Sequence, residues 1–300
     1  MKPFLTQLNY NFSILKKTVN RVAKNPKFII ELAIFIKNDF LSIFGCYHYS
    51  HNILFITGAP KSGTTWVQTQ LARVPGYNIR PIRDPDGCTK NQGICSEVFR
   101  TMPSKRYSVL KLHTRYNTNN YLVISNHVNK FIVMIRDVRD ICVSRYFHVK
   151  ADENHRHHKL YNHIPKEMGI LHSMNQMQEA FIDWIGNWAS FIGDSKSDIL
   201  LIRYEDINRD PYSEFLRILL FFDIQVPPSL LYDMASSKLK KETDLNKVVQ
   251  SNLGGRMKST ARKGIIGDWR NHFTPAHKKK MKVIAGELLI QLGYETSNDW

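Results

Sequence analysis

The sequence has few cysteines, and their spacing suggests no dense disulfide framework. Four cysteines occur in 300 residues, and none of them forms a CxxC pair. They are Cys46, Cys88, Cys95 and Cys142. A reducing cytosol is the simplest interpretation, and we therefore expect a cytoplasmic protein.

Long hydrophobic runs are also absent. The most apolar stretch, residues 28–44, is interrupted by charged and amide side chains, so we expect no stable membrane span. No small-residue cleavage site follows an apolar segment, which argues against a secretory signal. Basic residues upstream leave open a helix that lies on a membrane surface. A helix packed against the core is the favoured interpretation.

Acidic residues are outnumbered by basic ones. The 42 Lys and Arg against 26 Asp and Glu give a formal charge of +16, which raises the local concentration of anions. Nucleic acid, an anionic membrane and a phosphorylated small molecule all fit this charge. No internal repeat or low-complexity linker divides the chain. We therefore expect an N-terminal helical appendage, residues 1–50, and one main domain, residues 51–300.

Short apolar runs rich in β-branched residues alternate with helical patterns. The predicted strands are Ile53 to Thr57, Ser108 to Leu112, Phe131 to Arg136 and Asp198 to Arg203. Asp210-Pro211 and Thr274-Pro275 each have an N-cap residue followed by proline at the first helical position. The alternation predicts an α/β domain with a mostly parallel sheet flanked by helices, and with ligands at the carboxyl ends of the strands.

The first motif with chemical meaning follows the first strand. Gly58 to Trp66 reads Gly-Ala-Pro-Lys-Ser-Gly-Thr-Thr-Trp, a turn that leads into a helix. Such a turn directs backbone N–H groups and the helix dipole at a phosphate, and Gly63 lets the backbone come close to it. It is not a Walker A loop, because Lys61 precedes the second glycine instead of following it. The alternative is a turn that only feeds a helix.

Two further motifs are basic. The strand that begins at Phe131 ends in Arg136, and a cationic strand end suits a phosphate better than Mg²⁺. An Arg–Asp cluster that caps the next helix explains the same residues equally well. Residues 256–270 form a basic segment, for which a solvated charge run and a nucleic-acid patch are the alternatives. The glycines within this segment argue against a charge run that only contacts solvent.

Together the three motifs resemble the cytosolic sulfotransferase family, which uses 3′-phosphoadenosine 5′-phosphosulfate (PAPS). Pro60 to Trp66 matches the family's 5′-phosphosulfate loop, and Arg136 to Ser144 its 3′-phosphate segment. Arg262 to Trp269 matches its C-terminal Arg-Lys-Gly-x-x-Gly-Asp-Trp motif. The resemblance extends from about Asn52 to Gly293. It implies a single sulfotransferase domain with a five-stranded parallel sheet and a phosphate loop like that of P-loop kinases.

The resemblance also implies roles for individual residues. His113 would be the general base, with Lys61, Lys111 and Ser144 completing the catalytic set. Trp66 and Tyr204 would contact adenine. The donor-binding residues would be Lys61, Ser62, Gly63, Thr64, Thr65, Trp66, Arg136, Ser144, Tyr204, Arg262, Lys263 and Gly264. A sulfuryl group carries less negative charge than a phosphoryl group, so we expect lysine cations to replace a metal ion.

The sequence departs from the family pattern in three places. Leu112 stands where the family has threonine beside its histidine, so the acceptor pocket is expected to differ. The family's Ser-Phe pair is not evident near Ser236 and Ser237. The family's dimerisation stretch is replaced by Thr274-Pro275 and the Lys278–Lys280 run, so we expect no dimer through it.

A histidine-rich loop, His155 to His158 with His163, permits a metal site as one interpretation. It has no acidic or cysteine partner at a recognised spacing, so a cationic lid over the acceptor is favoured.

Three rival functions remain. They are a nucleotide kinase, which needs Mg²⁺, a nucleic-acid-binding protein and a membrane-associated carbohydrate sulfotransferase. We expect no nucleic-acid partner, because the basic residues cluster in nucleotide motifs. The acceptor, a hydroxyl or amine of a small molecule, is not readable from the sequence.

Overall fold

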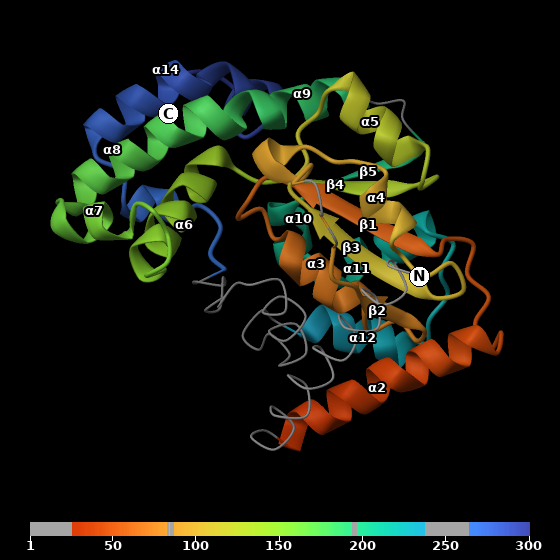
Figure 1. Ribbon diagram of the computed structural model, residues 1–300. Coiled ribbons are helices and arrows are strands. Elements are labelled where there is room, and N and C mark those ends of the chain that lie inside the picture. The colour runs from red at the N-terminus through yellow and green to blue at the C-terminus, as the bar shows by residue number, and fades with distance from the viewer. Residues whose placement is uncertain (1–25, 83, 85–86, 194–196, 238–263) are drawn as a thin grey trace.

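A single parallel sheet forms the centre of the molecule (Figure 1). The computed structural model describes residues 26–82, 84, 87–193, 197–237 and 264–300. Its five strands have the order β2-β3-β1-β4-β5, and every neighbouring pair is parallel. The strands are β1 (Ile53–Gly58), β2 (Tyr77–Ile79), β3 (Tyr107–Leu112), β4 (Phe131–Ile135) and β5 (Ile199–Arg203).

The four strands predicted from apolar runs are confirmed, with ends that differ by a residue or so. The parallel sheet and the single α/β domain are confirmed as well. The prediction missed β2, because three residues are too few to show a period in hydrophobicity. This short strand lies at the edge of the sheet and pairs only with β3 among the described residues.

Helices cover both faces of the sheet, because alternate strand residues point to opposite sides. Leu54 and Ile56 of β1 belong to one apolar cluster, which also contains side chains from α3, α11 and α12. Phe55 belongs to a second cluster on the other face, which contains side chains from α6, α8, α9 and α14. The larger helices of these two layers are α3 (Thr64–Leu71), α6 (Val138–Ala151), α8 (Lys166–Met177), α9 (Asp183–Ile192), α11 (Pro211–Phe221), α12 (Pro228–Ser236) and α14 (Pro275–Gln291).

Shorter helices and turns connect these elements. They are α4 (Glu97–Arg100), α5 (Thr118–Ser125), α7 (His158–His163), α10 (Tyr204–Arg209), the single turns η1 (Lys90–Gln92) and η3 (Asp268–Asn271), and the π-helical turn η2 (Gln178–Ile182) that precedes α9. The remaining helix, α2 (Pro26–Ile43), lies along the molecule beside β2 and apart from the others (Figure 1).

Both predicted helix starts are confirmed. Asp210 accepts a hydrogen bond from the backbone N–H of Ser213 at the start of α11. Thr274 and His277 form a reciprocal capping box at the start of α14, and the buried His277 ring also contacts the backbone oxygen of Glu167. The chain therefore uses the Thr274-Pro275 stretch for internal contacts.

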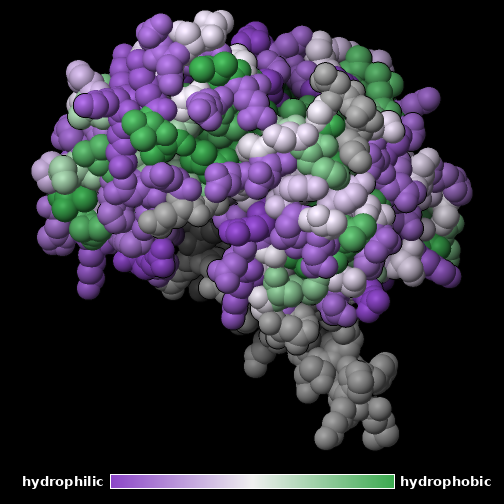
Figure 2. All heavy atoms as spheres, turned by 90° about the horizontal axis from the view of Figure 1, so that it is seen from above, coloured by the Kyte–Doolittle hydropathy of each residue, from purple (hydrophilic) through white to green (hydrophobic). Residues whose placement is uncertain are grey.

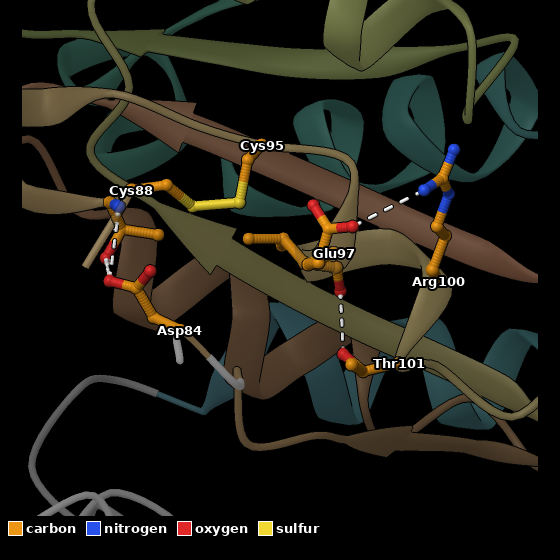
Figure 3. Close-up of a disulfide and its surroundings, with 8 residues drawn as sticks. Asp84, Cys88, Cys95, Glu97, Arg100 and Thr101 are labelled. Carbon is orange, nitrogen blue, oxygen red and sulfur yellow. Dashed lines mark hydrogen bonds and ion pairs between the residues drawn. A yellow bond between two sulfur atoms is a disulfide. The ribbon is translucent and has the colours of Figure 1, made fainter. Parts of the chain in front are cut away.

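The structure pairs Cys88 with Cys95 in a disulfide, which the cysteine spacing did not lead us to expect (Figure 3). The turn η1 folds the chain back and brings the two cysteines together. Asp84 accepts hydrogen bonds from Thr89 beside this bridge. The backbone oxygen of Gln92 in the same loop accepts from the backbone N–H of Arg115. The bridged loop thus supports the segment that follows β3.

The surface is mixed in character. Hydrophilic residues are spread over the face shown in Figure 2, with smaller hydrophobic patches among them. None of the helices in the described part of the chain is long and apolar enough to cross a membrane.

The capping box at α14 generates a prediction about stability and assembly. Thr274→Ala removes the side-chain acceptor for the N–H of His277 and should lower the free energy of unfolding by about 1 kcal/mol. Because this stretch is engaged inside the chain, the sedimentation coefficient should not change. A dimer of the unmodified protein that this substitution dissociates would contradict the prediction.

Candidate active site

The residues named in the motifs come together at one edge of the sheet. Lys61 follows β1, His113 follows β3, Arg136 follows β4 and Tyr204 follows β5. These four strands are adjacent and parallel, so their carboxyl ends share one edge. The sheet therefore brings together groups that are up to 143 positions apart in the sequence, as the numbers of Lys61 and Tyr204 show.

The loop after β1 has the geometry of an anion-binding turn. Lys61 and Gly63 both have positive φ, at 74° and 90°. A Cβ atom on Gly63 would lie 2.7 Å from the ring of Tyr204, so this position requires glycine for space as well as for conformation. Ser62 is buried and donates its hydroxyl to the backbone oxygen of Ala59, which fixes the turn.

The first turn of α3 carries no side-chain cap. The backbone N–H groups at the start of a helix have no partner within the helix, and the helix dipole adds partial positive charge there. Thr64 and Thr65 occupy this turn, and the hydroxyl of Thr65 accepts a hydrogen bond from Lys111 Nζ at 3.1 Å. The turn and the lysine of β3 together offer donors to an anion.

Arg136 joins three segments at the end of β4. Its guanidinium donates to the backbone oxygen of Lys61 at 3.0 Å and to that of Ile265 at 3.4 Å. It also lies 4.1 Å from the centre of the Tyr204 ring. Its Nε is buried and has no hydrogen-bond partner within the described part of the chain. An unpaired buried donor in a basic site suits an anionic group of the ligand.

The Arg–Asp motif performs two tasks. Asp137 caps α6 and forms a buried ion pair with Arg139, as the capping interpretation predicts. Arg136 instead donates to the loop after β1, and its guanidinium lies 3.8 Å from the carboxylate of Asp140. The capping interpretation is therefore confirmed for Asp137, whereas phosphate binding by Arg136 stays a prediction.

The third motif lies against the second. The buried carboxylate of Asp140 accepts hydrogen bonds from the backbone N–H groups of Gly267 and Trp269, at 2.7 and 3.0 Å. Burial raises the pKa of Asp140, and the neighbouring Arg136 opposes this shift. The backbone oxygen of Gly264 accepts from Asn208 on α10.

Asp140 and Asn208 were not among the predicted site residues. The available signal for Asp140 was an acidic residue within an otherwise basic motif, whereas nothing in the sequence marked Asn208. Arg262 and Lys263 lie outside the described residues. Ser144 is buried on α6, one turn beyond Asp140, and so faces the same side of that helix.

His113 is held as a neutral imidazole. Its Nδ1 lies 2.6 Å from the backbone oxygen of Gly58, an acceptor, so Nδ1 carries the proton and Nε2 carries the lone pair. Burial lowers the pKa of His113 to about 4, with a further lowering from Lys111 and Lys61. The ring is therefore unprotonated at neutral pH and is oriented as a base.

The two aromatic residues proposed for adenine contact are largely buried. Trp66 packs against Phe215, and its indole N–H donates to the backbone oxygen of Ser237. The expected Ser-Phe position thus lies directly beside Trp66. Tyr204 lies under Arg136 and against the loop after β1. Their adenine contacts stay predictions.

The histidine-rich loop packs against α8. The rings of His157 and His172 are in contact, and Gln176 of α8 lies 2.8 Å from His157 Nε2. Burial, with nearby arginines, lowers the pKa of His155 and His157. The lowered pKa favours the neutral form of both rings. Its role as a lid stays a prediction.

The sheet is parallel throughout, with an anion-binding turn after its central strand and basic groups at the neighbouring strand ends. This arrangement is typical of nucleotide-dependent group-transfer enzymes. The family model described as "Sulfotransferase domain" matches residues 52–293. The chain belongs to the sulfotransferase family and is an enzyme of that class.

Several known proteins are similar to this chain. Human "Sulfotransferase 1C2" is 28% identical over 255 residues, which are 77% of this chain and 81% of the relative. "Cytosolic sulfotransferase 3" of Arabidopsis thaliana is 23% identical, over 79% and 76%. The structure of mouse sulfotransferase SULT7A1 complexed with PAP has a TM-score of 0.60 at 19% identity, covering 84% of this chain and 89% of that one. This likeness confirms the fold.

The contact between Asp140 and the third motif generates a prediction. Asp140→Asn keeps one oxygen acceptor but turns an amide group toward a backbone N–H, so one of two charge-assisted hydrogen bonds is lost. The free energy of unfolding should fall by about 1.5–3 kcal/mol in denaturant titrations. Asp206→Asn is the control, because Asp206 forms an exposed ion pair with Arg209 and its loss should cost less than about 1 kcal/mol. Equal losses for the two variants would refute the structural importance of Asp140.

Proposed function

We propose that this enzyme transfers the sulfuryl group of PAPS to a hydroxyl or amine of a small acceptor, with His113 as general base. The observation that carries the proposal is the convergence of an anion-binding turn, two lysines and a neutral histidine at one sheet edge. Several solved relatives, including the mouse enzyme, were determined with PAP, which supports a 3′-phosphoadenosine nucleotide as the donor.

The donor would be held at both of its phosphate ends. The turn Lys61 to Thr65 would bind the 5′-phosphosulfate with backbone N–H groups and hydroxyls. Arg136, Ser144 and the segment Arg262 to Gly264 would surround the 3′-phosphate. The buried, unpaired Nε of Arg136 supports this assignment. Trp66 and Tyr204 would contact adenine.

The residues support an in-line transfer. His113 Nε2 would take the proton of the acceptor hydroxyl while the new bond from the acceptor oxygen to sulfur forms. At the same time the bond from sulfur to the bridging oxygen of the nucleotide breaks. Lys61 and Lys111 would stabilise the negative charge that develops on that bridging oxygen. Positioning and charge stabilisation supply most of the catalysis in transfers of this kind, so the proposed reaction needs no metal ion.

Two further parts of the proposal concern partners and location. The basic groups described here gather at strand ends, which favours a nucleotide over nucleic acid as the anionic partner. A cytoplasmic location is supported by relatives named as cytosolic, whereas the Cys88–Cys95 disulfide is uncommon in that compartment. Cell fractionation tests the location, because absence of the protein from the cytoplasmic fraction would refute it. Alkylation of free thiols in that fraction then shows whether Cys88 and Cys95 are paired there.

One prediction of this proposal concerns His113. His113→Ala should lower turnover by about 10²–10⁴-fold at saturating donor, because the acceptor proton then has no positioned base. Binding of adenosine 3′,5′-bisphosphate, measured by calorimetry, should change little. His127→Ala is the matched control, since the His127 ring contacts the backbone oxygen of Val123 and the ring of Phe99, ahead of β4 and not at its carboxyl end. Wild-type turnover in His113→Ala would remove His113 from the mechanism.

The pH dependence has a defined sign. His113 must be unprotonated to act as a base, so activity should be present above its pKa and should be lost as the pH falls through it. The free enzyme has this pKa near 4. Bound PAPS adds negative charge beside Lys61 and Lys111, so the acid limb of kcat should lie above that value. An acid limb that is unchanged in His113→Gln would contradict the assignment.

A further prediction concerns the 3′-phosphate. The protein should bind adenosine 3′,5′-bisphosphate at least about 10²-fold more tightly than adenosine 5′-monophosphate, because two hydrogen bonds to a charged group are worth roughly 1.5–3 kcal/mol each. Arg262→Ala should reduce this ratio, whereas Lys279→Ala on the exposed side of α14 should not. Equal dissociation constants for the two nucleotides in calorimetric titration would refute the proposed 3′-phosphate site.

A further inference from the structure

The helix α2 contacts the rest of the protein through its polar face. Asn38, Asp39 and Ser42 are buried, although they are polar. Residues at i, i+4, i+7 and i+8 share one side of a helix, and on α2 this side is apolar and exposed. This orientation is the reverse of an ordinary surface helix, which packs its apolar face on the core.

Specific bonds fix this reversed orientation. Asp39 pairs with Arg80, which follows β2, and with Arg106, which precedes β3. Asn78 of β2 donates to Asp39 and to the backbone oxygen of Phe35, at 2.8 and 3.1 Å. The buried carboxylate thus has three polar partners on the domain. Rotation of α2 to bury its apolar face would leave these groups unpaired, so the helix is held with that face outward.

The outward face is continuous. Ile36, Phe40 and Phe44 have 57%, 58% and 67% of their surface exposed, and Ile43 lies between them at 45%. The rings of Phe40 and Phe44 are 4.5 Å apart. We refer to Ile36, Phe40, Ile43 and Phe44 as the α2 apolar face. A contiguous exposed apolar patch of this kind marks a site of interaction.

The charge of the adjoining sequence indicates what occupies this face. The first 30 residues contain no Asp or Glu, and Glu31 is the first acidic residue of the chain. They contain six basic residues, which are Lys2, Lys16, Lys17, Arg21, Lys24 and Lys27. A basic segment that adjoins an exposed apolar helix in the sequence is complementary in charge to an anionic lipid surface. They oppose contact with a second copy, because both chains carry the same charge of +16.

We propose that the α2 apolar face inserts into the surface of an anionic lipid bilayer and holds the enzyme there as a peripheral membrane protein. The aromatic and aliphatic side chains enter the boundary between headgroups and acyl chains. The net positive charge of the first 30 residues attracts the anionic surface. The polar face remains bound to β2, so α2 connects the domain to the membrane without crossing it.

The experiment is flotation of the full chain with vesicles. Vesicles of phosphatidylcholine with phosphatidylserine should bind the protein, and vesicles of phosphatidylcholine alone should bind it at least about tenfold less, with binding reduced by added salt. Phe40→Ser together with Phe44→Ser should lower partition into the anionic vesicles by at least about tenfold. Leu220→Ser is the matched control, because Leu220 is about equally exposed but belongs to α11 and not to α2.

A fluorophore on Cys46 provides a second measurement. Cys46 is exposed and unpaired, two residues beyond Phe44, and Cys142 is buried. An environment-sensitive dye there should report a less polar surrounding when anionic vesicles are added. The double serine variant should show no such change.

Several outcomes would overturn the proposal. They are failure of the unmodified chain to bind anionic vesicles, equal binding by the double serine variant, and a dimer in sedimentation that the double variant dissociates. The last outcome would assign the face to a second copy. Turnover in the absence of vesicles should be the same for all three proteins, because none of the substituted residues lies at the strand ends. A failure of the nucleotide-binding and turnover experiments therefore leaves the membrane proposal intact. A failure of the vesicle experiments likewise leaves the proposed sulfuryl transfer intact.

Discussion

The buried guanidinium of Arg136 is the interaction on which the site depends. It binds the loop after β1 through Lys61, the C-terminal segment through Ile265, and the start of α10 through the Tyr204 ring. These segments are distant in the sequence and have no common secondary structure. A planar cation with donors fixed in several directions can hold all of them at once, which the flexible ammonium of a lysine cannot do. In the part of the chain that the structure describes, its Nε has no hydrogen-bond partner.

A second arginine of the motif that begins at Arg136 holds the C-terminal end of the chain. Arg139 pairs with Asp137 and Glu295 in the interior, and its guanidinium lies 4.2 and 4.5 Å from the rings of Trp269 and Trp300. Buried ion pairs contribute little net stability, because desolvation offsets the attraction. They do select one arrangement, because any other would leave a buried charge unpaired. The last residues of the chain are thereby held against the helix that carries Asp140 and Ser144.

The proposed PAPS site and the proposed membrane contact of α2 both depend on positive charge, but in different ways. At the strand ends, basic side chains are partly buried and hydrogen-bonded, and we propose that they bind one small anion. In the first 30 residues, basic side chains accompany an exposed apolar face and suit an extended anionic surface. Net charge alone does not distinguish these uses, and the contacts around Arg136 and Asp39 do. A membrane-bound sulfotransferase would meet acceptors that partition into lipid.

The sequence by itself determined the α/β class, four of the five strands and the helix starts at Asp210 and Thr274. It did so because buried strands and caps have local signals: runs of β-branched residues, and a capping side chain followed by proline. The motif from Lys61 to Trp66 was equally local, since a turn and a helix start are read from neighbouring residues.

Only the tertiary structure decided the contacts between distant segments. The hydrogen bonds of Asp140 to the third motif, the pairing of Cys88 with Cys95 and the reversed orientation of α2 all join residues across turns or strands. The amphipathic pattern of residues 28–44 predicts a helix with two faces but does not state which face the domain covers. The ion pairs of Asp39 determine which face the domain covers, because a buried carboxylate is stable only beside groups of opposite charge. Those groups are Arg80 and Arg106, and the fold brings them to Asp39.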